Sequence, residues 1–367
     1  ATGAISPSIC LSATFRHPRF GESTGYDYGR VANPTRESLE KTVALLERGG
    51  RSWALSSGMA AVQLVFSLLS AGDHVLMSED LYGGTVRLAE EVFAGYGITF
   101  EYVDVRDLAL VGKRMRSETK LVFIETPSNP MMQIADIAAL SALAHENGAL
   151  LAVDNTFLSP HFQKPLTLGA DIVLHSGTKY LCGHNDVIAG FLVLKDATSA
   201  QAKHIELLAK SAGPNLSALD SWLMLRSIKT LGVRVERQAE NALAIARWLG
   251  TLPEVTEVLY PGLADHPGYA LQQKQASGAG GMISFKVRSA ELAKAALGKL
   301  HLIAFAESLG GVETLLTYPL VQTHAEMPKE LIRRTGLDEC LLRLSVGLED
   351  VEDLKADLAQ ALKMAAR

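Results

Sequence analysis

One lysine stands among small, hydroxylated residues directly after an apolar run. Residues 172–174 (Ile-Val-Leu) predict a buried strand, and Ser176-Gly177-Thr178-Lys179 follows it. Open α/β sheets bind ligands at the carboxyl ends of their strands, so this segment would place two hydroxyls and an amine at such an edge. The hydroxyls suit a phosphate and the amine suits a carbonyl, as a Schiff base with a phosphorylated aldehyde requires. Taken alone, the segment also fits an ordinary surface lysine at a strand end.

A second apolar strand, at 149–153, ends in a carboxylate. Asp154 follows five apolar residues, and burying its charge is costly unless a cation meets it. A protonated pyridine nitrogen is such a cation. A lysine Schiff base with an acidic partner for the pyridinium is the mark of pyridoxal 5'-phosphate (PLP) sites. Lys179 and Asp154 together therefore indicate a PLP enzyme.

This strand-Asp154 and Ser176-x-Thr178-Lys179 pattern resembles the PLP-dependent enzymes of Cys/Met metabolism, the trans-sulfuration family, and the likeness covers nearly the whole chain. The resemblance implies an α/β protein of PLP-dependent transferase fold type I (aspartate aminotransferase-like). Such a fold has a mainly parallel seven-stranded sheet with helices on both faces and a smaller C-terminal α+β domain. We expect an N-terminal arm at 1–45 that contacts the neighbouring subunit, a PLP-binding domain at 46–235 and the small domain at 236–367.

The resemblance also assigns cofactor contacts besides the Schiff base on Lys179. Tyr82, the second expected catalytic residue, would stack on the pyridine ring, although without the family pattern it is equally typical of a turn. The further expected contacts are Gly58 and Met59 at a helix N-terminus, Ser176 and Thr178 for the phosphate, Asn129 for the phenolic oxygen, and Tyr28 and Arg30 of the arm for the phosphate in the neighbouring subunit. Each of Gly58, Tyr82, Asn129, Asp154 and Lys179 follows a predicted strand end, which strengthens the assignment.

Residues expected to bind the substrate lie mostly in the C-terminal half. Arg343 is alone inside an apolar strand, where a guanidinium needs an anion, and the α-carboxylate of an amino acid suits its fork. By resemblance, Asn129 helps to hold that carboxylate, Ser308 lies near the lysine, and Glu307 points to the far end of the substrate. A solvated loop acid is the simpler alternative for Glu307. Residues 322–324 resemble a mobile loop over the site.

Composition excludes several other classes of protein. The chain has 367 residues, 48% hydrophobic and 20% charged, and a net charge of −5, which does not favour nucleic acid or an anionic membrane as a partner. Cys10, Cys182 and Cys340 are too far apart for a metal site, and we interpret His184 and Asp186 as structural. We expect a reduced, cytoplasmic protein without a signal peptide or membrane span.

Alternating strand and helix patterns indicate a parallel sheet covered on both faces. The strands of the large domain are expected at 53–55, 74–78, 98–103, 120–125, 149–153, 171–175 and 191–195. A helix at 37–47 would be capped by Asn33 or Thr35. We also expect a helix at 85–96, a long helix that bridges to the second domain within 201–250, and a loop at 261–281.

Within the family, the residues at 82–85, 183–186, 220–223 and 317–319 are most similar to bacterial cystathionine γ-synthases. This implies γ-replacement on an O-acylhomoserine by cysteine, with O-acetylhomoserine sulfhydrylation as a possible addition. The alternatives are a cystathionine γ-lyase or β-lyase, a methionine γ-lyase and, more distantly, a PLP aminotransferase. Glu307 suits a substrate with a distal ammonium, and Gly84 stands where methionine γ-lyases usually carry a cysteine. Small amino acids are the expected partners of a homo-oligomer, a tetramer built from catalytic dimers.

Overall fold

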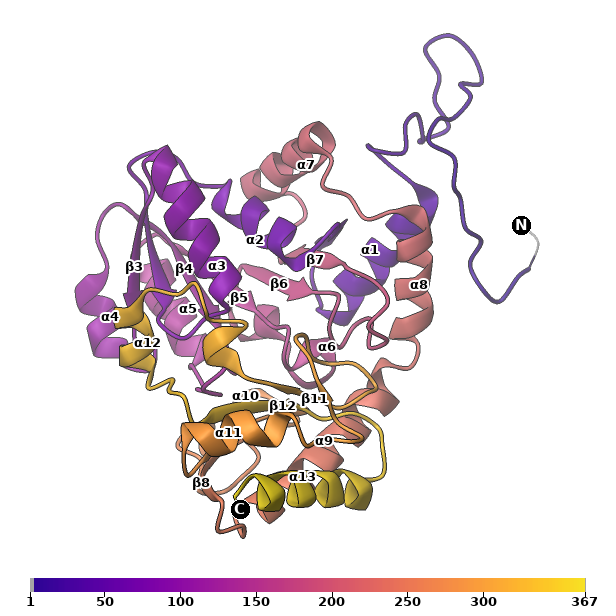
Figure 1. The fold of residues 1–367 in the computed structure, drawn as a ribbon. Helices are drawn as coiled ribbons and strands as arrows, with labels where there is room; N and C mark the ends of the chain where they lie inside the picture. Colours follow the sequence, from indigo (N-terminus) through magenta and orange to yellow (C-terminus); the bar gives the residue numbers. More distant parts are fainter. Residues whose placement is uncertain (1–2, 367) are drawn as a thin grey trace.

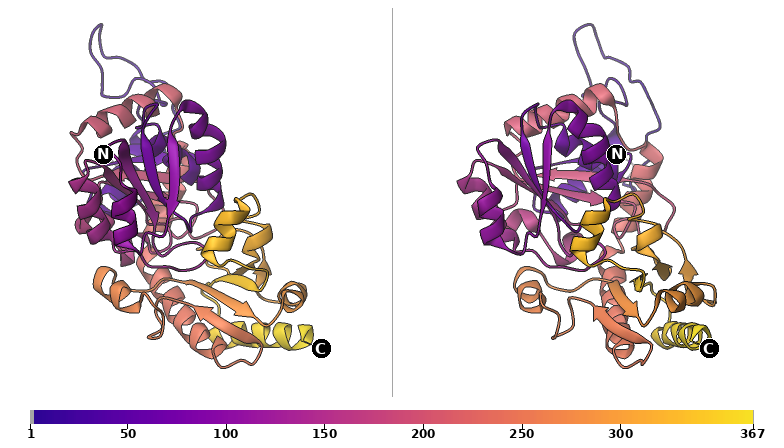
Figure 2. Two further views of the ribbon diagram at one scale, coloured as in Figure 1. Left: turned by 90° about the vertical axis from the view of Figure 1, so that its left-hand side faces the viewer. Right: turned by 60° about the vertical axis from the view of Figure 1, so that its left-hand side comes forward.

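A large and a small domain make up the computed structural model, which describes residues 3–366 (Figures 1 and 2). Residues 1, 2 and 367, which belong to the predicted arm and small domain, lie outside the described residues. Two sheets form the cores of the domains, one with seven strands and one with five. This confirms the predicted fold class.

The larger sheet has the strand order β1-β7-β6-β5-β4-β2-β3. Its strands are β1 (Arg51–Leu55), β2 (His74–Ser78), β3 (Thr99–Val103), β4 (Thr119–Glu125), β5 (Leu150–Asp154), β6 (Ile172–Ser176) and β7 (Gly190–Leu194). Strand β7 runs opposite to the other six, so its pairings with β1 and β6 are antiparallel and the remaining pairings are parallel. Most positions of these strands are buried, as expected for a parallel sheet covered on both faces.

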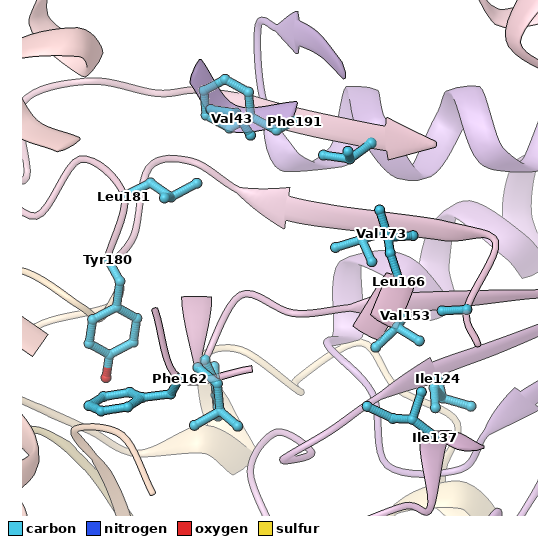
Figure 3. Packing of buried hydrophobic residues seen from close by; sticks show 14 of the residues in the cluster. Val43, Ile124, Ile137, Val153, Phe162, Leu166, Val173, Tyr180, Leu181 and Phe191 are labelled. Atoms are coloured by element: carbon cyan, nitrogen blue, oxygen red, sulfur yellow. The ribbon is translucent and has the colours of Figure 1, made fainter. Parts of the chain in front are cut away.

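Helices cover both faces of this sheet (Figure 1). One face packs against α1 (Pro34–Leu46), α4 (Leu108–Arg114), α5 (Ile137–Glu146) and α8 (Ala218–Ile228). The other packs against α2 (Gly58–Phe66), α3 (Gly83–Leu88) and α7 (Ala200–Ala212). Figure 3 shows the first of these cores, in which Val153 and Val173 of adjacent strands lie near Ile124 and Ile137.

The small domain is built around an antiparallel sheet with one parallel edge pair, in the order β10-β11-β12-β9-β8. The strands are β8 (Val255–Leu259), β9 (Met282–Val287), β10 (Ala304–Phe305), β11 (Leu315–Thr317) and β12 (Leu341–Ser345). The helices packed on it are α9 (Leu231–Leu249), α11 (Ala290–Leu297) and α13 (Val351–Ala365). As predicted, one long helix joins the domains: Val235 of α9 belongs to the large core and Ile245 to the small one.

Two segments of the second half return toward the large domain. Helix α12 (Lys329–Thr335) and the preceding turn η4 (Pro319–Val321) lie close to the large sheet (Figure 2). Met327 and Leu331 share a hydrophobic core with α2 and α3. This segment therefore closes over the strand ends at which the candidate residues lie.

Most of the segment at residues 3–33, before α1, extends away from the rest of the chain (Figure 1). Ile5, Leu11 and Phe20 are exposed there. Helix α1 then begins at Pro34, and the side chain of Asn33 accepts hydrogen bonds from the backbone of Thr35 and Arg36. Asn33, rather than Thr35, is the cap.

One expectation about secondary structure is refined and another is wrong. The predicted helix at 85–96 is helical throughout but changes type: α3 ends at Leu88 and is followed by a π-helix, η1 (Ala89–Phe93), and a 3₁₀ turn, η2 (Ala94–Tyr96). In this path Phe93 packs edge-on against Phe66. The predicted loop at 261–281 contains α10 (Tyr269–Gln275), whose helix-forming residues are flanked by turn residues that masked the pattern. Short turns complete the chain at α6 (Ser159–Phe162) and η3 (Pro165–Leu168).

No helix among residues 3–366 has the length and apolar character needed to cross a membrane.

Candidate active site

A cavity of about 280 Å³ opens where the strand ends of the large sheet face the small domain. It brings together most of the residues that the sequence predicted. Its lining includes Gly58, Met59, Tyr82, Asn129, Asp154, Ser176, Thr178, Lys179, Glu307, Ser308 and Arg343. The eight residues from Gly58 to Lys179 in this set lie at the ends of β1, β2, β4, β5 and β6 or in the turns that follow these strands. Three residues from the C-terminal domain close the other side.

Lys179 lies in the turn after β6, and its amine reaches across to the small domain. Nζ donates a hydrogen bond to Ser308 Oγ at 2.7 Å. Burial lowers the pKa of Lys179 to about 8, and the positive charge of Arg343 acts in the same direction. A substantial fraction of this amine is therefore neutral near physiological pH, as nucleophilic attack on a carbonyl requires.

Ser308 is held in a backbone conformation that is rare for residues other than glycine, with φ at 88°. Its carbonyl accepts a hydrogen bond from Arg343 at 3.2 Å, while its hydroxyl accepts the one from Lys179. Such strain persists only where surrounding contacts impose it. The local backbone of Ser308 thus directs its hydroxyl to the lysine and its carbonyl to the arginine.

Asp154 ends β5 and keeps one oxygen available. Both of its hydrogen bonds use Oδ1, which accepts from the backbone N of Thr156 at 3.0 Å and from its hydroxyl at 2.5 Å. Burial raises the pKa of Asp154, whereas Thr156 and the charge of His175 act in the opposite direction. Among residues 3–366, no hydrogen bond is formed by Oδ2.

A second carboxyl group, Glu125, stands in register with Asp154 on the neighbouring strand. Its Oε2 accepts a hydrogen bond from the backbone N of Tyr82 at 3.0 Å. Burial and the nearby charge of Asp154 raise the pKa of Glu125 well above its usual range. Asp154 has two donors and Glu125 only one, so we assign the proton of this pair to Glu125 and the negative charge to Asp154.

The N-terminus of α2 forms one end of the cavity. Ser57 caps this helix through the backbone N of Ala60, which leaves the N–H groups of Gly58 and Met59 without an acceptor among the described residues. A Cβ atom at Gly58 would lie 2.8 Å from the Cβ of Ser176, so only glycine lets the two segments approach this closely. Free N–H groups at a helix start attract an anion.

The two hydroxyls predicted for phosphate differ in their surroundings. Ser176 lines the cavity, and its hydroxyl forms no hydrogen bond within residues 3–366. The hydroxyl of Thr178 donates to the carbonyl of Ala189 at 3.2 Å and accepts from its backbone N at 3.0 Å. Thr178 therefore also fixes the path of the chain before β7.

Arg343 in β12 is fully buried yet incompletely paired. One terminal nitrogen donates to Asn129 Oδ1 at 2.7 Å, and the other to the Ser308 carbonyl and, at 3.4 Å, to Thr317 Oγ1. Its Nε has no acceptor among the described residues. Burial lowers the pKa of Arg343 to about 10, against the attraction of Glu125. A buried guanidinium with a free donor is a ready site for a carboxylate.

Tyr82 follows β2 and lies at the cavity wall, where its backbone is held by Glu125. The side chain is 40% exposed, so a ligand in the cavity can cover it. Gly84 lies beneath the ring: a Cβ atom there would come within 2.5 Å of the ring atom Cε1. Any side chain at position 84 would displace the ring of Tyr82.

Tyr28 and Arg30 do not line this cavity. Arg30 is hydrogen-bonded to the carbonyl of Lys210, and its guanidinium lies 5.5 Å from the ring centre of Tyr28. Both residues lie on the arm, in the segment before α1, and neither is part of the cavity lining. Their contact with the cofactor of a neighbouring subunit stays a prediction.

Residues around the site that the sequence left open have structural contacts. In the predicted mobile loop, His324 donates Nε2–H to the carbonyl of Asn129 at 3.0 Å, and burial lowers the pKa of its imidazole to about 4. Neither His184 nor Asp186 lines the cavity: the first bonds to the Cys182 carbonyl and the second accepts from the Cys182 thiol. Within residues 3–366, no cluster of three or more His, Cys, Asp or Glu side chains could hold a metal ion.

Sequence reasoning missed Glu125 and Thr156, which both shape the charge of the site. Glu125 ends its strand directly before the Thr126-Pro127 turn, so a carboxylate at a predicted strand end was the available signal. Thr156 stands two residues after Asp154, the spacing at which a carboxylate accepts from its own chain. Phe157 and Ile188 also line the cavity and carry no such signal.

The geometry fits a phosphorylated pyridine aldehyde. The free N–H groups of α2 and the Ser176 hydroxyl suit its phosphate, Asp154 Oδ2 its ring nitrogen, and the amine of Lys179 its carbonyl. The unpaired Nε of Arg343 leaves a place for an amino-acid carboxylate. Each of these unsatisfied groups is a contact that PLP or an amino acid would complete.

Comparisons with known proteins agree with this chemistry. The model of the Cys/Met metabolism PLP-dependent enzyme family matches residues 1–363. From Bacillus subtilis, cystathionine γ-lyase and cystathionine β-lyase MetC are each 47% identical over 362 residues, 99% of this chain, and the matches cover 95% and 92% of their lengths. The cystathionine γ-synthase/O-acetylhomoserine (thiol)-lyase of the same organism is 46% identical over 98% of this chain and 92% of its own.

A solved structure shares the fold over the whole chain. Cystathionine γ-synthase from Xanthomonas oryzae, in complex with aminoacrylate and cysteine, superposes with a TM-score of 0.96 at 42% identity, covering 100% of this chain and 95% of that one. Synthases and lyases are thus similar to this chain to nearly the same degree.

Proposed function

The chain belongs to the Cys/Met metabolism PLP-dependent enzymes, and on that basis we propose that it forms cystathionine from an O-acylhomoserine and cysteine. In this reaction the carboxylic acid leaves the γ-carbon of the homoserine, and the sulfur of cysteine takes its place. The products are cystathionine and the free acid. The use of PLP and of sulfur amino acids is common to the family, whereas the γ-replacement is our proposal.

Glu307 is the observation that carries this choice. Its carboxylate lines the cavity next to Ser308, and no other described side chain forms a hydrogen bond or ion pair with it. A free carboxylate at the cavity wall complements the distal ammonium of cystathionine or of an incoming cysteine. An O-acylhomoserine has no such ammonium, so Glu307 would serve the second substrate.

Other side chains have roles that follow from their contacts. The Arg343 guanidinium and Asn129 would hold the α-carboxylate of the substrate, because they are already bonded to each other and one donor remains free. Lys179 Nζ, neutral in part near pH 8, would remove the α-proton and later a proton of the β-carbon, which must be lost before the group on the γ-carbon can leave. Ser308 Oγ would hold this amine between the two positions.

The cofactor is positioned for its chemistry by three groups of the chain. Bound PLP supplies an electron sink for the carbanion formed at the α-carbon. Asp154 would keep its ring nitrogen protonated, Tyr82 would cover one face of the ring, and the start of α2 would hold the phosphate. Tyr28 and Arg30 would complete that phosphate site from a neighbouring chain, so we propose a homo-oligomer built from dimers, in the cytoplasm.

A lyase is the second candidate, because the B. subtilis relatives at 47% identity are a γ-lyase and a β-lyase. Glu307 would suit cystathionine as a lyase substrate equally well. A synthase adds a thiol to the carbon from which the first group has left, whereas a lyase releases the remaining carbon chain without adding a thiol. Gly84 argues against a methionine γ-lyase, since those enzymes usually carry a cysteine at this position.

Product analysis separates these activities. The purified holoenzyme is incubated with O-acetylhomoserine or O-succinylhomoserine plus cysteine, and separately with cystathionine, and the products are identified by mass spectrometry. We expect cystathionine from the first reaction, and no activity from Lys179→Ala. Faster release of pyruvate and homocysteine, or of 2-oxobutanoate and cysteine, from cystathionine would replace the synthase with a β-lyase or a γ-lyase, respectively.

A further inference from the structure

A buried ion pair lies behind the cofactor site and takes no part in the proposed chemistry. Glu47 Oε1, at the end of α1, accepts a hydrogen bond from His175 Nε2 at 2.6 Å. The side chains are 0% and 1% exposed. The same oxygen accepts from Asn155 Nδ2 at 2.9 Å, and Glu47 Oε2 has no partner among residues 3–366.

This pair is attached to the two strand ends that carry the main cofactor residues. Asn155 directly follows Asp154, and His175 directly precedes Ser176. One carboxylate oxygen thus joins the tips of β5 and β6. The network continues through Gln163, whose amide donates to Asn155 Oδ1 at 3.1 Å and to the carbonyl of Thr126, three residues before Asn129.

The network lies on the reverse face of the sheet. Asp154 is in register with Leu174, so their side chains share one face, and the next residue, His175, points to the other. Accordingly, none of Glu47, Asn155 and His175 lines the cavity. These residues act on the site only through the backbone and through their charge.

The carboxylate of Glu47 requires a cation, because a buried charge without a partner is strongly destabilising. Its hydrogen-bond partners among the described residues are His175 and the neutral Asn155. Of these two, only His175 can supply a compensating positive charge. Such a charge lies between Glu47 at the back of the sheet and Asp154 at the cavity, and it lowers the pKa of Asp154.

We infer that Glu47 and His175 are positioning residues of the PLP site, which tie the tips of β5 and β6 together and place a positive charge behind Asp154. That charge favours the ionised form of Asp154, the form that can pair with a protonated ring nitrogen. The inference depends on PLP binding by this family member and is independent of the sulfur substrate.

A cofactor analogue separates this effect from a loss of structure. PLP and its 1-deaza analogue, which has carbon in place of the ring nitrogen, share the phosphate, the aldehyde and the ring size. The dissociation constants of both are measured by absorbance on full-length protein from which the cofactor has been removed. Wild-type protein is expected to prefer PLP, because only PLP can pair with Asp154.

We expect His175→Gln and Glu47→Gln to reduce the ratio of the two dissociation constants by about tenfold, the effect of removing one opposite charge near a carboxylate. Glu47→Gln acts because it removes the carboxylate that pairs with His175. The double variant, Glu47→Gln with His175→Gln, keeps hydrogen-bonding groups but no charge, and it should fold and show the same reduced ratio.

His74→Gln is the matched control. His74 is also 1% exposed and lies at the start of β2, where its Nδ1 is hydrogen-bonded to Thr119 at 2.8 Å. The ratio of the two dissociation constants for the His74→Gln variant should equal that of wild-type protein. The inference would be overturned if the Glu47 and His175 variants bound PLP and the 1-deaza analogue more weakly by the same factor, so that the ratio did not change. It would also be overturned if wild-type protein bound the two cofactors equally well. Failure of the synthase assay would leave this ratio unaffected.

Discussion

Replacement of Arg343 with lysine tests whether its guanidinium holds the substrate carboxylate. Arg343 is buried, two of its nitrogens are committed to Asn129, Ser308 and Thr317, and Nε is free. A charge-assisted hydrogen bond contributes about 1.5–3 kcal/mol. A lysine would keep one of the two hydrogen bonds that a guanidinium makes to a carboxylate and would lose the other. Since about 1.4 kcal/mol corresponds to a tenfold change in affinity, we expect carboxylate binding to weaken by about 10- to 150-fold.

The assay compares two ligands that differ only in the carboxylate, norvaline and butylamine. Binding of each to the holoenzyme is followed by the visible absorbance of the cofactor. Arg343→Lys should weaken the binding of norvaline by about 10- to 150-fold and the binding of butylamine by less than about threefold. Arg234→Lys is the control, because this buried arginine donates to the backbone carbonyls of Tyr180 and Ser227 and does not line the cavity. Equal weakening of both ligands by Arg343→Lys would refute the assignment.

Three further predictions follow from single side chains. Burial raises the pKa of Asp80 to about 6; the folded state therefore binds this proton more tightly than the unfolded chain, and its contribution to stability is lost as the pH rises from 4 through 6. Asp80→Asn should accordingly gain about 2 kcal/mol relative to wild-type protein between pH 4 and pH 7 in urea unfolding, and a constant difference would contradict this. Gly84→Ala should lower kcat, because the Cβ of the new alanine displaces the Tyr82 ring. The melting temperature of this variant should stay within a few degrees of the wild-type value. An unchanged kcat would show that the position of the ring does not matter for catalysis. Glu307→Gln should raise KM for cysteine about 5- to 30-fold, as expected for the loss of a partly solvated charge, and should leave KM for the O-acylhomoserine unchanged. Glu313→Gln is the control: Glu313 is paired with Asn185 outside the cavity, so its replacement should change neither KM.

The sequence predicted the fold and most of the cavity lining, in part through local rules and in part through the family resemblance. Apolar runs that end in polar or small residues marked the ends of β5 and β6, and parallel strands bring such ends to one edge. Asp154 and Lys179 were found in this way. Helix α10 and the break after Leu88 were missed, because turn residues hid the first and no residue pattern distinguishes a π-helix from an α-helix.

Contacts between distant segments were beyond such reasoning. Arg343 meets Asn129 across 214 positions, and Glu47 meets His175 across 128. The first could be anticipated in part, because a lone arginine in an apolar strand demands an anion. The second could not, since Glu47 ends an amphipathic helix next to a glycine pair and has the sequence context of an ordinary surface acid.

Buried polar groups without a partner occur on both faces of the large sheet. Buried polar groups are normally paired, and each exception calls for an explanation. On the reverse face of the sheet, Glu47, His175, Asn155 and Gln163 bond mainly to one another, and Glu47 Oε2 and Gln163 Oε1 have no partner among the described residues. In the residues that line the cavity, Arg343 Nε and Asp154 Oδ2 form no hydrogen bond within residues 3–366, and there a ligand can supply the missing partner. A cation for Asp154 and an anion for Arg343 are the two poles of a bound PLP and amino-acid pair, so the polarity of the site follows from what its own residues leave unpaired.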